Sequence, residues 1–145
     1  MSTETTGRFT PTGWDESVIE DIDGEGETKN GTYYPSRGVT TAKVTFQYTG
    51  DIDGTSATTY LFAYRDSKAG HADIRGYERF TGTIGSREGS CVFRHTGSYE
   101  DGAVSDHVEV LPGLGTDGLA DLTGSADISM AGAPPEGGYE FTLRS

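Results

Sequence analysis

The chain has 145 residues, enough for one domain with a hydrophobic core and too few for two ordinary domains. Its formal charge of -12, from 23 acidic residues against 11 lysines and arginines, repels phosphate backbones and anionic lipid headgroups, so we expect neither nucleic acid nor a membrane as a partner. The single cysteine, Cys91, excludes an intramolecular disulfide and is typical of a reducing compartment. Because no signal peptide or membrane-spanning segment is readable, the sequence predicts a soluble, cytoplasmic protein.

Short runs rich in Thr, Val, Tyr and Phe recur along the chain, and no long stretch has apolar residues at helical spacing. We predict eight strands, over residues 7–15, 37–48, 55–65, 71–85, 89–100, 103–111, 122–131 and 138–143. Short links such as Asp101-Gly102 make consecutive strands antiparallel neighbours. The sequence therefore predicts a single all-β domain over residues 1–145, an eight-stranded antiparallel up-and-down β-barrel, with a mobile acidic loop at 16–36.

Alternation along two of these strands places Glu78 and His95 on the face that points into the barrel. If residues 87–88 form the tip of the hairpin, Phe80 lies opposite His95 and Glu78 lies opposite Gly97. Glu78 and His95 are then diagonal neighbours, with Cβ atoms about 5 to 7 Å apart.

The neighbouring links extend this polar cluster to other strands. The turn at 101–102 sets Gly97 opposite Asp106, and the link after the third strand sets Thr58 opposite Glu78. Glycines at 76, 82 and 97 leave space inside the barrel.

A carboxylate inside a barrel that lies beside a histidine has the properties of a general acid and base pair. We therefore predict Glu78 and His95 as catalytic residues, with no metal ion and no cofactor. The predicted substrate-binding residues are Thr58, Tyr60, Phe62, Tyr64, Phe80, Phe93, Tyr99 and Asp106.

Each of these residues also has a structural interpretation. Glu78 could form an ion pair with Arg79 or Arg94, and His95 could be a core histidine bonded to a hydroxyl group. The aromatic residues could simply fill the barrel, and Cys91 fits a small core residue better than a nucleophile.

One acidic segment resembles the start of a calcium-binding loop. Asp21, Asp23 and Glu25 match early positions of an EF-hand loop, but Thr32 occupies the last liganding position and no flanking helices are readable. The pattern therefore argues weakly for calcium.

Several segments resemble successive motifs of one bacterial family, the domain of unknown function 3224 family. They are WDE at 14–16, GDIDG at 50–54, YLFAYR at 60–65, GYERFTG at 76–82, GSCVFRHTGSYEDG at 89–102 and PGLGTDGLADLTG at 112–124. The family is similar in architecture to the allene oxide cyclases, and the resemblance implies an eight-stranded antiparallel barrel that commonly forms homo-oligomers. Related barrels act as cyclases in natural product biosynthesis, but no functional residue can be aligned from the plant enzymes.

Two functions of different class remain open. The first is a cofactor-independent cyclase or isomerase that acts on an apolar natural-product or lipid-like intermediate held in the barrel. The second is a non-catalytic barrel that binds a small hydrophobic molecule or dimerises. A filled barrel would argue against the first function, whereas a hydrophobic cavity of about 300 Å³ or more would be compatible with it. A homodimer is expected because the outer face of the third strand, including Leu61, is less polar than a solvated strand.

Overall fold

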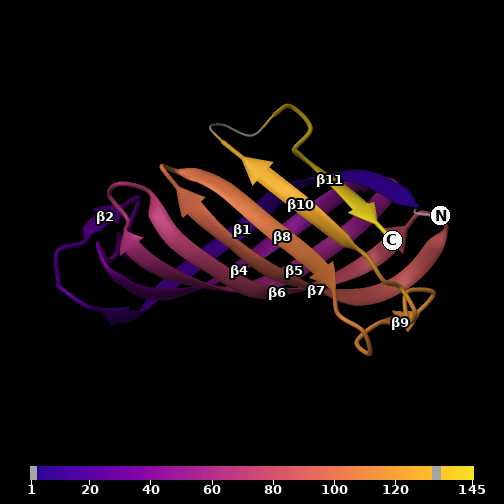
Figure 1. Cartoon of the computed structure of the whole chain (residues 1–145), viewed down its shortest axis with the longest axis horizontal. Coiled ribbons are helices and arrows are strands. Elements are labelled where there is room, and N and C mark those ends of the chain that lie inside the picture. Colours follow the sequence, from indigo (N-terminus) through magenta and orange to yellow (C-terminus); the bar gives the residue numbers. More distant parts are fainter. Residues whose placement is uncertain (1–2, 132–134) are drawn as a thin grey trace.

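The computed structural model describes residues 3–131 and 135–145 and consists of strands, turns and loops (Figure 1). Eight strands follow one another around a closed barrel, each antiparallel to the next, and the last pairs back with the first. They are β1 (Glu4–Asp21), β4 (Gly38–Gly50), β5 (Ile52–Asp66), β6 (His71–Ile84), β7 (Arg87–Glu100), β8 (Ala103–Val110), β10 (Ser125–Met130) and β11 (Tyr139–Arg144). The predicted eight-stranded antiparallel up-and-down barrel is confirmed.

The described residues contain three further short strands, of which β9 extends the barrel sheet and the other two form a sheet of their own. The pair β2 (Glu27–Lys29) and β3 (Thr32–Tyr34) forms a hairpin between β1 and β4, and β9 (Thr116–Asp117) pairs with β7. The segment expected to be an acidic loop at 16–36 thus contains the end of β1 and this hairpin. Its mobility stays a prediction.

The carboxylates that resemble a calcium-binding loop form hydrogen bonds and an ion pair with residues of this segment and its flank. Asp21 accepts hydrogen bonds from the Gly24 amide at 2.9 Å and the Tyr33 hydroxyl at 2.7 Å. Asp23 pairs with Arg37 at 3.1 Å, and this hydrogen bond lowers the pKa of the Asp23 carboxyl. Within residues 3–131 and 135–145, no group of three or more His, Cys, Asp or Glu residues is placed to hold a metal ion.

Alternate residues of every strand point inward and form the hydrophobic core. This core fills one end of the barrel. Its centre consists of aromatic rings with centroids in contact distance: Tyr48 and Phe80 at 5.3 Å, Phe93 and Phe141 at 5.5 Å, and Phe80 and Phe93 at 6.1 Å. Phe80, Phe93 and Phe141 are fully buried. Phe80 and Phe93, which we predicted to bind substrate, are therefore core residues.

The register of the strands tests the sequence argument directly. The predicted pairs Thr58 with Glu78 and Gly97 with Asp106 are confirmed. The predicted tip of the β6–β7 hairpin at 87–88 is wrong, because Ile84 pairs with Arg87 and the two-residue turn is at 85–86.

The physical reason is Gly85, whose φ of 64° gives the positive φ that a two-residue hairpin turn requires at its first central position. Glu78 consequently lies opposite Phe93, and His95 lies opposite Gly76. The partner of Glu78 thus shifts by four residues along β7, from Gly97 to Phe93, and an even shift keeps both side chains on the inward face. Glu78 and His95 remain diagonal neighbours.

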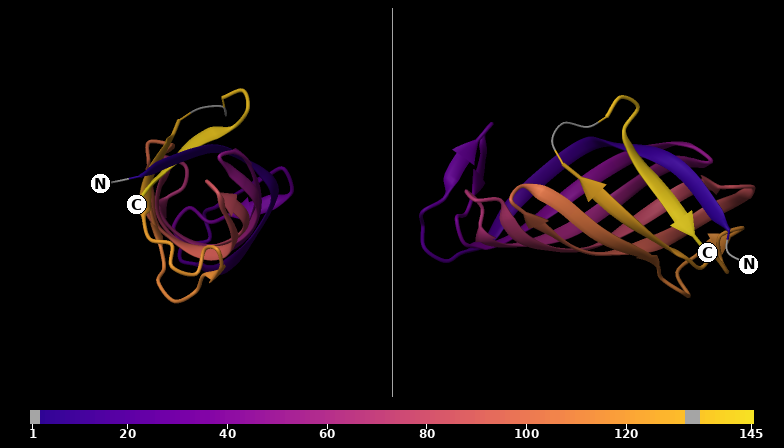
Figure 2. Two further views of the ribbon diagram at one scale, coloured as in Figure 1. Left: turned by 90° about the vertical axis from the view of Figure 1, so that its right-hand side faces the viewer. Right: turned by 45° about the horizontal axis from the view of Figure 1, so that its top comes forward.

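The wall of the barrel is complete at one end only. β11 pairs with β1 over Glu4–Phe9, whereas β4 pairs with β1 as far as Asp21. The edge of β1 beyond Phe9 that faces away from β4 has no ladder partner among the described residues. β10 and β11 share only the pair Ser125 and Arg144, and Figure 2 shows them diverging from that point.

The outside of the barrel is mostly polar. Leu61 on the outer face of β5 is 48% exposed, and Tyr77 on the neighbouring β6 is 57% exposed. Whether a second copy of the chain covers this face stays a prediction. In the part of the chain that the structure describes, no helix has the length and apolar character to cross a membrane.

The distinction between core and surface aromatic residues can be measured. We expect Phe80→Ala to lower the free energy of unfolding by about 3 to 5 kcal/mol, because it leaves a cavity among closely packed rings. The matched variant Tyr77→Ala removes a ring on the outer face of the same strand and should cost less than about 1 kcal/mol. Urea unfolding followed by circular dichroism measures both, and equal losses would contradict the assignment of Phe80 to the core.

Candidate active site

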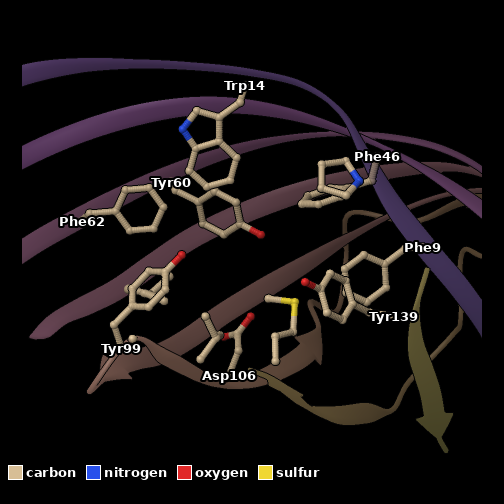
Figure 3. A pocket seen from close by; sticks show the side chains of 13 residues that line it. Phe9, Trp14, Phe46, Tyr60, Phe62, Tyr99, Asp106 and Tyr139 are labelled. Atoms are coloured by element: carbon tan, nitrogen blue, oxygen red, sulfur yellow. The ribbon is translucent and has the colours of Figure 1, made fainter. Parts of the chain in front are cut away.

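The open end of the barrel contains a cavity of about 320 Å³ (Figure 3). Residues from both sides of the incomplete wall line it, including Trp14 on β1, Met130 on β10 and Tyr139 on β11. Aromatic rings form most of its surface: Phe9, Trp14, Phe46, Tyr60, Phe62, Tyr99 and Tyr139. The Trp14 and Phe62 rings are stacked, with centroids 5.9 Å apart and planes at 7°. Such a surface suits a small, largely apolar molecule.

Below this cavity lies the polar cluster centred on Glu78. Its Oε2 accepts hydrogen bonds from the Tyr48 hydroxyl at 2.6 Å and from Ser56 Oγ at 2.5 Å. Its Oε1 lies 2.7 Å from Nε2 of His95. The Glu78 side chain is 1% exposed and His95 is 3% exposed, so neither group meets bulk water.

His95 joins Glu78 to a second carboxylate. Its Nδ1 lies 2.6 Å from Asp106 Oδ2, so both ring nitrogens are bonded to carboxylate oxygens. The other oxygen of Asp106, Oδ1, is buried and has no hydrogen-bond partner within residues 3–131 and 135–145. Asp106 also lines the cavity, whereas Glu78 and His95 do not. Of the three hydrogen-bonded residues Glu78, His95 and Asp106, only Asp106 therefore contributes to the lining of the cavity.

This geometry determines the charge of the histidine. Burial by itself lowers the pKa of His95, but the hydrogen bonds to Asp106 and Glu78 outweigh it and raise the pKa to about 9. At neutral pH the ring is an imidazolium whose two N–H groups both donate. Burial, together with the nearby Glu78 carboxylate, also raises the pKa of the Tyr48 hydroxyl, which keeps it a hydrogen-bond donor.

Two glycines make the cluster possible. A Cβ at Gly97 would lie 2.8 Å from Asp106 Oδ1, and a Cβ at Gly76 would lie 2.7 Å from the Tyr60 ring. Because neither residue has a Cβ atom, there is room for the Asp106 carboxylate beside Gly97. The same lack of a Cβ at Gly76 lets Tyr60 pack edge-on against His95, with ring centroids 5.3 Å apart. The third predicted glycine, Gly82, instead permits close contact between backbones, since its Cβ would lie 2.1 Å from the Asp53 carbonyl oxygen.

The structure separates the predicted site residues into groups. Tyr60, Phe62, Tyr99 and Asp106 line the cavity, while Glu78 and His95 lie beneath it. Thr58 is buried on the same inner face, but its Oγ1 lacks a hydrogen-bond partner in the part of the chain that the structure describes.

The structural alternative for Glu78, an ion pair with arginine, is wrong. Arg94 pairs instead with Glu109 on the outer face, at 3.1 Å, and Arg79 also lies outside. Alternation predicts this outcome, because Arg79 and Arg94 each occupy the strand face opposite to the inner one.

The buried Cys91 is a core residue. Burial raises the pKa of its thiol to about 12, so it is not a thiolate nucleophile at neutral pH.

Sequence analysis missed two sets of polar residues. Tyr48 and Ser56, which bind Glu78, follow from the same alternation that places Thr58 inside, so the signal was present. Glu16 was assigned to the acidic loop because the first strand was predicted to end at Asp15. It is buried in β1 and accepts hydrogen bonds from Trp14, Thr40 and Tyr64. Tyr64, which we predicted to bind substrate, thus donates to Glu16 and does not line the main cavity.

Together these features define a small closed β-barrel with an aromatic cavity and a buried acid–histidine–acid chain at its base. The family described as protein of unknown function (DUF3224) matches residues 5–143, and the chain belongs to this family. A crystal structure of a protein of unknown function from the same family, from Shewanella oneidensis MR-1, is similar, with a TM-score of 0.69 and 22% identity over 99% of this chain and 96% of that chain. That similarity concerns the fold. No curated protein matches the chain.

The ionisation of His95 gives a pH-dependent prediction. The pKa of His95 in the folded protein, about 9, exceeds its ordinary value of 6.5, so the stabilisation is complete below pH 6.5 and is lost as the pH rises through about 9. We expect a loss on the order of 3 kcal/mol in the free energy of unfolding across this range. Urea unfolding between pH 6 and pH 10 measures it.

Glu78→Gln supplies the internal test, because it removes one of the two carboxylates that hold the proton on His95. NMR of histidine-labelled protein should show the His95 midpoint near pH 9 in the unmodified chain and a clearly lower midpoint in the variant. Glu88→Gln, an exposed position on β7, controls for the change in net charge. Equal midpoints in Glu78→Gln and the unmodified chain would contradict the assigned hydrogen-bond chain.

Proposed function

We propose that the protein is a cofactor-independent isomerase or cyclase that holds a largely apolar, natural-product or lipid-like molecule in the cavity and moves a proton on it. One observation carries the proposal. Asp106 lines the aromatic cavity, its Oδ2 is tied to His95, and its buried Oδ1 has no hydrogen-bond partner among the described residues. A carboxylate that is held in place and shielded from water is suited to general base catalysis.

The three members of the chain have different roles in this proposal. Asp106 is the catalytic residue, because it is the member that lines the cavity. His95 and Glu78, which the sequence suggested as the catalytic pair, are positioning residues. The imidazolium fixes Asp106 Oδ2 and offsets its charge, and Glu78 fixes the ring from the other side.

The proposed reaction needs no oxidant or reductant. Asp106 takes a proton from one carbon of the substrate, and the same proton returns to another atom after the electron pair has shifted or closed a ring. The aromatic walls hold an extended molecule in the reactive conformation, and such positioning can lower a barrier by roughly 7 to 11 kcal/mol in the best cases. Few catalytic groups are therefore required.

A non-catalytic role as a binding protein for small hydrophobic molecules is the second candidate. It is favoured by the burial of Asp106 Oδ1 against Gly97, since a base must approach the substrate closely. Binding alone requires only the aromatic cavity.

Both functions require a ligand in the cavity, and this can be tested with the only tryptophan of the sequence. Trp14 lines the cavity and stacks on Phe62, so a bound molecule should change its fluorescence. We expect saturable changes with 1-octanol and with 5-nitrobenzisoxazole. The absence of any saturable change would overturn both candidate functions.

Proton transfer is then tested separately. A base that takes the C3 proton of 5-nitrobenzisoxazole breaks its N–O bond and releases a coloured cyanophenolate, so the reaction reports proton abstraction without a known substrate. We expect a rate above that of buffer, and a loss of about 100-fold or more in Asp106→Asn. Asp127→Asn, an exposed carboxylate on β10, should keep the rate. Saturable binding with equal rates in Asp106→Asn and the unmodified chain would leave only the binding function.

A further inference from the structure

A second buried carboxylate, Glu16, lies beside the main cavity and has no role in the proposed proton transfer. We propose that Glu16 and the aromatic rings around it hold the cationic head of an amphiphilic ligand, an amine or a quaternary ammonium group, whose apolar part occupies the main cavity. The inference rests on the proposed function in one respect, because it takes the main cavity to be a ligand site.

All three groups that bind Glu16 are neutral donors. Trp14 Nε1 donates to Oε1 at 3.0 Å, and the hydroxyl groups of Thr40 and Tyr64 donate to Oε2 at 2.6 and 2.7 Å. The residue is 9% exposed. Among the described residues, no Lys, Arg or His side chain forms an ion pair with it. A buried carboxylate of this kind lacks a counter-charge.

The space next to Glu16 is a cavity of about 260 Å³. Aromatic side chains on β1, β3, β5 and β7 contribute to its wall: Trp14, Tyr34, Tyr64 and Tyr99. Trp14 and Tyr99 also line the main cavity, so the two cavities adjoin. Figure 3 shows Trp14 and Tyr99 at one end of the main cavity, with Phe62 between them. We call the smaller cavity the Glu16 cage.

The chemistry of the Glu16 cage favours a cation. Aromatic faces attract ammonium groups, and quaternary ammonium ligands in particular are recognised by cages of several rings. The Glu16 carboxylate supplies the negative charge that attracts a cationic headgroup, and the attraction is strengthened because the site is partly desolvated. The same charge repels an anionic headgroup. A ligand with a cationic head and an apolar tail would therefore fill both cavities in one orientation.

The positive groups nearby do not oppose this assignment. His71 lines the Glu16 cage, but its Nδ1 lies 2.9 Å from Glu100 Oε2. Lys29 and Lys68 line a neighbouring cavity, which shares Tyr34 and Tyr64 with the Glu16 cage and also contains Glu27. Neither lysine lines the Glu16 cage itself. The formal charge of -12 also favours the approach of cations over that of anions.

Three probes with the same eight-carbon chain test the inference: octyltrimethylammonium, 1-octanol and octyl sulfate, each below its micellar concentration. Isothermal titration calorimetry at physiological salt measures their affinities. We expect octyltrimethylammonium to bind on the order of tenfold more tightly than 1-octanol, and octyl sulfate to bind more weakly than both. Equal affinities for the cation and the alcohol would overturn the inference and leave the proposed function intact. Failure of all three probes to bind would overturn the proposed function as well.

Variants then locate the preference. Glu16→Gln should remove most of the advantage of octyltrimethylammonium while 1-octanol still binds. Glu20→Gln, an exposed carboxylate on the same strand, changes the net charge equally and should keep the advantage. If both variants lost the advantage of octyltrimethylammonium equally, the net charge of the protein alone would account for it, and the inference would be overturned.

A second variant protects the test against misfolding, because Glu16→Gln replaces one acceptor oxygen with an amide N–H group, so the hydrogen bonds from Trp14, Thr40 and Tyr64 cannot all be kept as they are. Tyr34→Leu removes one ring of the Glu16 cage without touching a hydrogen bond to Glu16. It should lower the affinity for octyltrimethylammonium severalfold and spare 1-octanol. An unchanged preference for the cation in Tyr34→Leu would also overturn the Glu16 cage.

Discussion

The unequal lengths of its strands determine where this barrel is filled and where it is hollow. β1 has 18 residues, whereas β10 and β11 have six each. Closure therefore requires only the first residues of β1 to pair with β11, and the ladder ends at Phe9. At the closed end, inward side chains from all sides pack into a core. At the other end the wall lacks part of its circumference, and the main cavity lies against that gap.

The acid–histidine–acid chain lies at the boundary between these two halves. Glu78 is held from the core side by Tyr48 and Ser56, and Asp106 faces the cavity. Burying two carboxylates is unfavourable unless opposite charge and hydrogen bonds compensate, and the imidazolium of His95 provides both at once. The same contacts that make the cluster tolerable in the interior also fix the orientation of Asp106.

The two proposals concern two adjoining cavities, each with an acidic group in its lining. Asp106 would act at the base of the main cavity, and Glu16 would act at the far side of Trp14 and Tyr99. Trp14 belongs to both places, since it stacks on Phe62 and donates to Glu16. The hydrogen bond to Glu16 therefore helps to fix the Trp14 ring, which forms part of the wall of the main cavity.

Alternation along the strands was sufficient to predict the barrel, the inward direction of Glu78, His95 and Asp106, and their proximity. It succeeded even where the β6–β7 turn was misplaced, because the partners across the two strands shifted by four residues and an even shift of register preserves the face of every side chain. It also contained the signal for Ser56, two residues before Thr58 on the same strand.

Other features depended on pairings between distant strands. The end of β1 was missed because Glu16 to Asp21 show no alternation of apolar and polar residues, and they are held extended by their ladder with β4. Asp106 lines the cavity and Glu78 lies beneath it, and this difference depends on how far the core fills the barrel. The sequence by itself thus determined which residues point inward, because side-chain direction is a local property of a strand. Only the tertiary structure decided which of them meet a cavity, because that depends on where strands of unequal length stop pairing around the barrel.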